Sequence, residues 1–265
     1  MVKTELKDEL QNYNKRLSYY IRSSTFPLAI KMVETPDIPD EKIRRPKKQL
    51  NLSLTLCQAI GICRKHGWSI LLERDDISCP SAILFLGLAE APESYWQGKF
   101  VFAPNNQTEK ARAAKSNSLP RFPLKKYSGI LISPLFKAAF EPDCVLIYGN
   151  AAQMMRFVQA SVFKTGEDLK CVQQGGGTCA LEVVEPILKG EVGLVLPGNG
   201  ARIFGLVQDD EMVFSIPYRK MKDIIFYLQE SHKGGQRLPI PQYGMFSPEL
   251  PPEYIRLLET LQMGD

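Results

Sequence analysis

The chain has 265 residues, a formal net charge of +4 and 44% hydrophobic residues. This composition excludes an intrinsically disordered protein, and the length predicts one large domain or two small ones. The longest strongly apolar run covers residues 82–89. A membrane-spanning helix needs roughly 20 such residues, so no membrane association is expected. The small net charge does not by itself indicate a nucleic-acid partner.

The first part of the chain is expected to form two helices and two strands. In residues 1–24, apolar side chains recur at spacings of three and four, which predicts a helix docked on the periphery of the domain. Gly67 is a typical helix terminator. The elements expected after the first helix are a strand, a long surface loop with a basic cluster, a helix and a second strand, over residues 27–33, 34–49, 52–66 and 68–73.

A basic stretch interrupts the middle of the chain. Before it, Pro80 suits the first turn of a helix, which places Cys79 at or just before the N-cap. Residues 104–126 are polar and contain a run of cations without an acidic residue, so we expect a mobile basic excursion. Its binding of nucleic acid should be weak, salt-sensitive and not specific. Two strands and a helix are expected next, over residues 127–135, 143–150 and 151–163.

The last third of the chain repeats the strand, turn and helix arrangement. Residues 169–174 lead through three glycines into an apolar helix over residues 178–188, and the acidic triplet 209–211 is expected at a solvated hairpin tip. Three short strands and two helices are expected over residues 191–196, 202–207, 211–216, 218–230 and 252–262. These elements predict an α/β fold, a single domain of residues 1–265 with a mixed sheet and flanking helices.

Three turns rich in glycine or asparagine follow predicted strands. Residues 175–180 match G-x-G-x-x-A, but the preceding segment is too polar for a central strand and the expected acidic residue is missing, so a dinucleotide site is not predicted. Exposed N–H groups can still form an anion nest, and a plain mobile turn is the alternative. The residues predicted to bind an anionic small molecule are Gly149, Asn150, Gly175, Gly176, Gly177, Thr178, Gly198, Gly200 and Arg202.

Hydrolase chemistry of the triad type is not expected. The only histidines, His66 and His232, are both predicted at surface helix ends, and neither G-x-S-x-G nor H-E-x-x-H is present. A metal site rich in histidine is therefore excluded. No catalytic residue follows from the sequence, which leaves the question of enzymatic activity open.

The six cysteines include no C-x-x-C pair, which excludes zinc ribbons and thioredoxin-like motifs. Since no secretory signal is present, we expect a cytoplasmic protein whose cysteines are reduced thiols or metal ligands. Cys79 and Cys179 each begin an apolar helix, where the helix dipole favours the thiolate and should lower the thiol pKa. The alternative is that the cysteines are buried thiols without a role.

Segments along most of the chain carry a resemblance to a known family. They are PLAIKM, LCQAIGICRKHG, ISCPSAILFLGL, EPDCVLIYGNAAQMMRFVQA, TCALEVVEPILKG and DDEMVFSIPYRKMKDI. In this order they resemble the ArCR-like prokaryotic family called domain of unknown function 169. The resemblance implies recurrent cysteines at Cys57, Cys79 and Cys179, and glycine or asparagine at Gly149 and Asn150. A later C-x-G-C-R stretch corresponds to residues 198–202, where only the glycine and the arginine remain.

Two hypotheses follow from the cysteines and from the glycine turns. In the first, Cys57, Cys79 and Cys179 converge and hold an iron–sulfur cluster of the 4Fe-4S type with an open fourth position. Three thiolates suit such a cluster better than structural zinc, which takes four protein ligands. In the second, the protein is a non-enzymatic module that binds an anionic small molecule through the glycine-rich turns.

Overall fold

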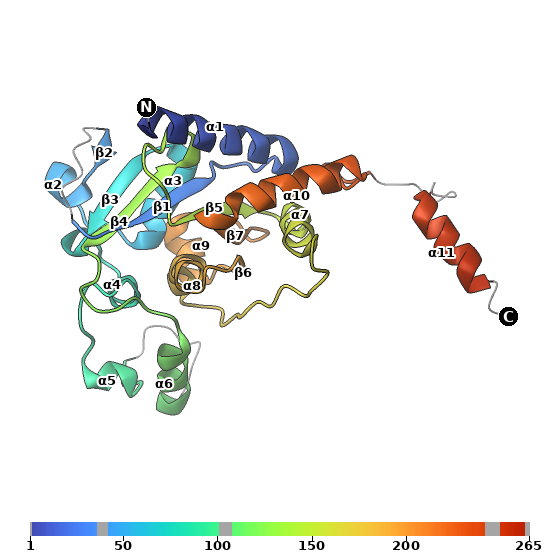
Figure 1. The fold of residues 1–265 in the computed structure, drawn as a ribbon. Helices are drawn as coiled ribbons and strands as arrows, with labels where there is room; N and C mark the ends of the chain where they lie inside the picture. The colour runs from blue at the N-terminus through green and yellow to red at the C-terminus, as the bar shows by residue number, and fades with distance from the viewer. Residues whose placement is uncertain (1, 36–41, 101–107, 242–249, 263–265) are drawn as a thin grey trace.

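The computed structural model describes residues 2–35, 42–100, 108–241 and 250–262. It confirms the predicted α/β class, because a single mixed sheet of seven strands carries helices on both faces (Figure 1). The strand order is β2-β3-β4-β1-β5-β7-β6, and only β2 and β3 pair in parallel. The strands are β1 Leu28–Val33, β2 Ile43–Arg44, β3 Ser69–Glu73, β4 Gly129–Pro134, β5 Cys144–Gly149, β6 Gly193–Val195 and β7 Met212–Pro217.

Alternation along the central strands divides the core into two layers, since successive side chains of a strand point to opposite faces. Ile30, Leu146 and Tyr148 belong to one buried cluster, whereas Ala29 and Val145 belong to the other. The first cluster joins the sheet to α3 Leu56–His66, α4 Pro80–Phe85, the helix of residues 178–189 and α9 Asn199–Gly205. The second joins it to α1 Val2–Ile21, α7 Ala151–Val162 and α10 Met221–Lys233.

The predicted N-terminal amphipathic helix is confirmed as α1. Its stripe of Leu10, Tyr13, Leu17 and Ile21 is buried, and the helix packs on α10 and on the 3-10 turn Leu135–Lys137. Among the described helices, none combines the length and the apolarity that crossing a bilayer requires. The remaining described helices are α2 Pro46–Leu50, α5 Glu93–Trp96, α6 Glu109–Ser118, α8 Glu185–Lys189 and α11 Pro252–Gln262, of which α11 lies away from the sheet (Figure 1).

The basic excursion predicted over residues 104–126 contains a helix. Residues 104–107 lie outside the described part, and the rest comprises α6 followed by a segment with the buried side chains of Leu119 and Phe122. Two cations of the stretch tie this region together. Arg112 Nε donates to the carbonyl of Gly98 at 2.6 Å, and the Arg121 guanidinium lies 4.2 Å from the centre of the Trp96 ring.

The strand predicted over residues 202–207 is wrong, because these residues belong to α9 and the turn after it. Alternating apolar residues favour a strand locally, yet Ile203 and Phe204 are exposed here. Ala201 and Gly205 are four residues apart, so they share the helix face that packs on α3. A β-carbon on Gly205 would lie only 2.8 Å from the carbonyl oxygen of Cys57. The close packing of α9 against the backbone of α3 therefore favours a helix over a strand in this segment.

Candidate functional site

Three elements bring Cys57, Cys79 and Cys179 to one region of the first core layer. Cys57 lies in the first turn of α3, between Thr55 and Gln58, which form the capping box of this helix. Cys79 is the N-cap of α4, as predicted from Pro80. Cys179 lies in the first turn of the helix that starts at Thr178. Cys179 is part of the buried cluster, and the other two cysteines pack against it.

The three thiols influence one another electrostatically. Burial is the main cause that raises the pKa of Cys57, to about 12, and an ionised Cys79 raises it as well. Burial also raises the pKa of Cys179 well above its usual value, and Cys57 and Cys79 add to this effect. Every pair among the three thiols is thus close enough to interact. The predicted low pKa of Cys179 is wrong, because loss of hydration outweighs the partial charge of the helix N-terminus.

A buried carboxyl group, that of Glu182, stands beside the thiols. Its side chain is 1% exposed, and Tyr148 on β5 donates a hydrogen bond from its hydroxyl group to Oε2 at 2.7 Å. Burial raises the pKa of Glu182 to about 7, although the bond from Tyr148 and the charge of Arg64 lower it. An ionised Glu182 in turn raises the pKa of Cys57 and Cys179, so the carboxyl group belongs to the same site.

A π-helical turn over Ala180–Val184 carries Glu182. Pro186 has no N–H group, so the carbonyl of Glu182 lacks its usual helical donor four residues later. The Ser215 hydroxyl on β7 replaces this donor and lies 2.8 Å from the carbonyl oxygen. Such turns occur often at functional sites. Here the turn locks the Glu182 backbone to the sheet.

Behind Tyr148 lies a fully buried ion pair. Arg64 on α3 donates two hydrogen bonds to the Glu211 carboxylate, at 2.8 and 2.9 Å, and a third to the Leu206 carbonyl at 2.8 Å. Its guanidinium carbon also lies 4.4 Å from the centre of the Tyr148 ring. Glu211 is therefore not at a solvated tip as predicted. The ion pair fixes the ring that holds Glu182.

Tyr95 closes the site from the side of α5 and α6. It is 5% exposed and hydrogen bonds to Ser81 and Ser116. Burial raises its pKa, and Cys179 and Cys79 contribute to the rise, which shows that the phenol faces the thiols. The predicted cysteine region is thus enclosed by residues that sequence patterns did not single out.

Within residues 2–35, 42–100, 108–241 and 250–262, no three side chains of His, Cys, Asp or Glu are arranged to hold a metal ion. The described structure thus has the thiols near one another without a preformed site for a single ion. Of the remaining cysteines, Cys63 and Cys144 belong to the same buried cluster as Cys179, and Glu182 also raises the pKa of Cys144. Cys63 and Cys144 are buried, and Cys171 is exposed.

Two of the predicted glycine turns meet, and the Gly198 N–H and the Arg202 guanidinium are already used as donors within the protein. A β-carbon on Gly198 would lie 2.6 Å from the carbonyl oxygen of Gly175, and Gly198 N donates to Thr178 Oγ1 at 2.9 Å. Arg202 points elsewhere, since its guanidinium donates to the carbonyls of Gln208 and Glu211. The surroundings of Gly200 are open, and Gly176 lies against Gly198. A β-carbon on Gly177 would collide with the side chain of Leu119.

Gly149 and Asn150 lie at the start of α7, in the other core layer. Asn150 caps α7, with its Oδ1 accepting a hydrogen bond from Gln153 N at 3.1 Å and Gln153 Oε1 accepting from Asn150 N at 2.8 Å. A side chain on Gly149 would collide with Gln153, whose amide donates to the carbonyls of Ile21 and Arg22 at the end of α1. Their role in the structure is to join α7 to α1.

The sequence analysis missed Arg64, Tyr148, Glu182 and Glu211. A signal existed for Arg64, because it follows Ile60 by four residues and so shares the buried face of its helix. Nothing local marks its partner, which is 147 residues away.

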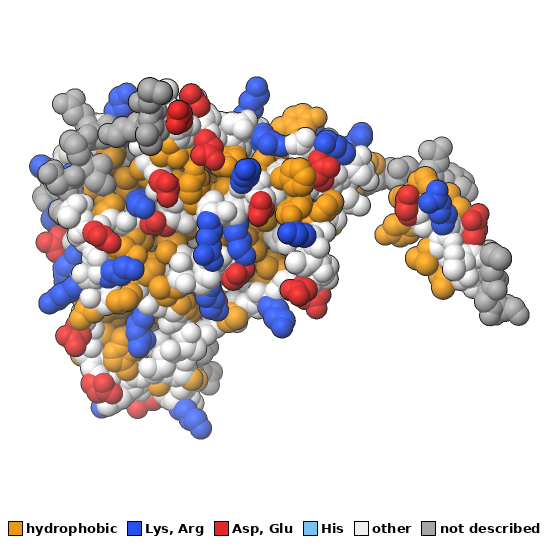
Figure 2. All heavy atoms as spheres, viewed as in Figure 1, with side chains coloured by type: hydrophobic (Ala, Val, Ile, Leu, Met, Phe, Trp, Pro, Cys, Tyr) orange, Lys and Arg blue, Asp and Glu red, His pale blue; other side chains and the backbone are white. Residues whose placement is uncertain are grey.

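On the molecular face drawn in Figure 2, Lys and Arg side chains are interspersed with acidic and apolar ones and form no continuous basic surface.

Comparison with known proteins places the chain among uncharacterised relatives. An uncharacterised protein of Methanocaldococcus jannaschii, MJ0308, is 23% identical over 218 residues, which cover 81% of this chain and 91% of the relative. No solved structure matches. The family model of DUF169, described as uncharacterised ArCR, matches residues 16–226, a range that includes all three cysteines, Glu182 and the Arg64–Glu211 pair. The chain therefore belongs to the DUF169 family.

Proposed function

We propose that the protein binds an iron–sulfur cluster of the 4Fe-4S type through Cys57, Cys79 and Cys179, with the fourth position open. The observation that supports this proposal most is that three thiols from three separate elements interact with one another in one buried region. Buried free cysteines are common and need no role. Three of them gathered beside a buried carboxyl group are harder to explain by packing alone.

The chemistry of the donor set fits a cluster better than a single ion. Iron–sulfur clusters are held by cysteine thiolates, with each thiolate bound to a separate iron. The thiolates of a cluster therefore stand farther apart than the ligands of one zinc ion, which are bonded at about 2.3 Å to the same centre. Among the described residues the thiols are not arranged to hold a metal ion, so this part of the proposal depends on the chemistry of the donor set alone.

Burial controls how the thiols would take up the group. Raised pKa values keep Cys57 and Cys179 protonated at neutral pH, so binding must release their protons. Loading should therefore increase with pH. Tyr95 and the surrounding apolar side chains keep water away from the buried Cys179, whereas Cys57 and Cys79 are half-buried. When bound, a cluster with an open iron supplies electron transfer or Lewis-acid chemistry.

Ala201 occupies the position at which the family resemblance implies a further cysteine. It is 3% exposed and belongs to the same buried cluster as Cys179. A methyl group there leaves no thiolate for a fourth iron, which is why we propose an open position. Replacing Ala201 by cysteine supplies a fourth thiolate and should make the bound cluster more resistant to oxygen.

The experiment is anaerobic reconstitution with iron and sulfide, followed by iron analysis and absorption and EPR spectroscopy. We expect about four iron atoms per chain, a loss of most of this iron in Cys57→Ser, Cys79→Ser and Cys179→Ser, and an unchanged content in Cys171→Ser, whose side chain is exposed. Failure of the parent protein to take up iron contradicts the proposal. So does equal iron content in the triple Cys→Ser variant and the parent.

The alternative proposal, a module that binds an anion at the glycine turns, has weaker support. Arg202 and Gly198 already donate to groups within the protein, so an anion would have to displace these bonds. Thermal unfolding with phosphate, nucleotides and carboxylates tests it. Stabilisation that is lost in Arg202→Ala would favour this alternative.

A further inference from the structure

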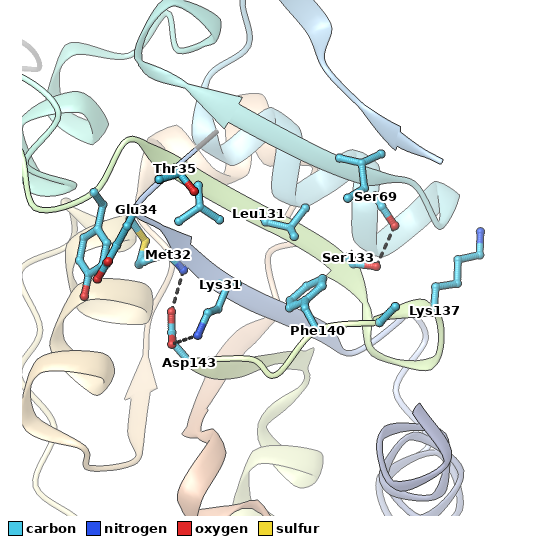
Figure 3. Close-up of a pocket in the computed structure, with 14 residues that line it drawn as sticks. Lys31, Met32, Glu34, Thr35, Ser69, Leu131, Ser133, Lys137, Phe140 and Asp143 are labelled. Carbon is cyan, nitrogen blue, oxygen red and sulfur yellow. Dashed lines mark hydrogen bonds and ion pairs between the residues drawn. The ribbon is translucent and has the colours of Figure 1, made fainter. Parts of the chain in front are cut away.

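The second face of the sheet is covered by helices over only part of its width. Helices α1, α7 and α10 pack on Ala29, Val145 and β7, whereas the surface of β3, β4 and the end of β1 is open and hollowed into a pocket of about 620 Å³ (Figure 3). This size is typical of small-molecule sites. The pocket lies on the face opposite the cysteines, because its floor residue Leu131 alternates with Ile130 and Ile132 of the first core layer.

The floor of the pocket is apolar. Val33, Ile43 and Leu131 form a small buried cluster with Leu71, and Phe140 packs against it from the segment that precedes β5. Figure 3 shows Leu131 and Phe140 at the middle of the pocket, between polar groups at both ends. Val33, Ile43 and Leu131 are already buried, and an apolar ring or chain placed there would contact them and cover the part of Phe140 that is still exposed.

One end of the pocket is electrically balanced. The Asp143 carboxylate accepts a hydrogen bond from Lys31 Nζ at 2.9 Å and one from Met32 N at 2.7 Å. Both of its oxygens therefore have partners, and the Lys31 charge is neutralised. Glu34 lies at this same end (Figure 3). Lys126 is close enough for its charge to interact with Glu34 and Asp143, so an anionic group of a ligand would find no unbalanced positive charge here.

The other end of the pocket carries a positive charge and hydroxyl groups. Lys137 Nζ donates to the Gly67 carbonyl at 2.7 Å and takes part in no ion pair among the described residues. An ammonium group has three donors, so two remain. Next to it, the hydroxyl groups of Ser69 and the buried Ser133 share a hydrogen bond of 2.7 Å. Ser133 can donate its one proton either to the Pro134 carbonyl, at 3.3 Å, or to Ser69, and in the second case the Ser69 hydroxyl is free to donate to a ligand.

We propose that this pocket binds a small organic carboxylate, with its apolar body over Leu131 and Phe140 and its carboxylate at Lys137 and Ser69. Charge sets the orientation, since the carboxylates at one end have cations beside them and Lys137 at the other end takes part in no ion pair among the described residues. The pocket adds a second ligand site on the face away from the cysteines. It is independent of the iron–sulfur proposal, and either can fail without the other.

The test is titration of the full chain, labelled at its methyl groups, with 4-phenylbutyrate, followed by NMR. We expect saturable shifts of the methyl signals of Val33, Ile43 and Leu131. The alcohol and the amine of the same carbon skeleton should bind at least tenfold more weakly. Lys137→Met should weaken carboxylate binding about tenfold, as expected for loss of one charge-assisted hydrogen bond.

The control variant is Lys222→Met, which removes an exposed lysine of α10 and should leave binding unchanged. Equal affinity for the acid and the alcohol would overturn the proposal, as would equal affinity of Lys137→Met and the parent. Shifts confined to other parts of the chain, or no saturable shift up to 10 mM ligand, overturn it as well.

Discussion

Removal of Glu211 should strongly destabilise the protein, because its partner Arg64 is fully buried. Arg64 has no exposed side-chain surface, and two of its three hydrogen bonds go to the Glu211 carboxylate. After Glu211→Ala, the guanidinium retains the Leu206 carbonyl and the face of the Tyr148 ring, while its Nε already lacks a partner. Breaking a buried ion pair on one side costs about 3–5 kcal/mol.

Urea denaturation at pH 7 measures this loss. Glu211→Ala should lower the free energy of unfolding by that amount, whereas Asp210→Ala, at an exposed neighbour, should change it by less than about 0.5 kcal/mol. The double variant Arg64→Met, Glu211→Leu should recover most of the loss, because both charges are then gone. A loss below about 1 kcal/mol for Glu211→Ala, or additive effects in the double variant, would refute the reasoning.

The same pair predicts a dependence on pH. Burial by itself would raise the pKa of Glu211, but the hydrogen bonds from Arg64 and from the Gln208 backbone outweigh it and lower the pKa. A carboxylate with a lowered pKa in the folded state stabilises the protein above its unfolded pKa, and this contribution is lost as the pH falls through the folded value. Acid should therefore destabilise the parent more than the double variant.

Three further predictions concern the core and the thiols. Burial raises the pKa of Glu182 from 4.5 to about 7. As the pH rises across this range, the free energy of unfolding of the parent should therefore fall relative to that of Glu182→Gln, by at most about 1.4 kcal/mol per pH unit. Parallel pH profiles of the two proteins would contradict this. Gly61→Ala should lower the free energy of unfolding, measured by chemical denaturation, by about 1–3 kcal/mol, because the new β-carbon would lie 2.6 Å from the Gly205 carbonyl oxygen. Gly200 lies in open space, so Gly200→Ala should be neutral or stabilise α9 by up to about 1 kcal/mol. Iodoacetamide at pH 8 should label the exposed Cys171 first and Cys144 last, since burial raises the pKa of Cys144. Mass spectrometry of the native protein measures this order. Rapid labelling of Cys144 would show that the core opens.

Local sequence patterns predicted most of the secondary structure near the candidate site. The N-cap position of Cys79 followed from Pro80, and the end of α3 followed from Gly67, whose φ of 70° is readily adopted by glycine. These features depend on a few neighbouring residues, and so the sequence contains them. The same is true of β1, β3, β4 and β5, whose apolar runs are short and bounded by turn residues.

Other features depended on residues far apart in the sequence. The alternation in residues 202–207 favours a strand, and only the close approach of Gly205 to the backbone of α3 made this segment a helix. The acidic triplet gave no sign that Glu211 would turn inward, because its partner lies on another element.

The cysteine region depends both on local sequence patterns and on tertiary packing. By itself, the sequence determined that helices begin close to Cys79 and Cys179, because the placement of Pro80 and the change from a glycine run to an apolar segment each act over about one turn of chain. Only the tertiary structure decided that these thiols lie beside Cys57 and Glu182, and that Cys179 has a raised rather than a lowered pKa. Desolvation is a property of everything packed around a group, and the packed layers of helix and sheet that exclude water here come together only when the whole chain folds.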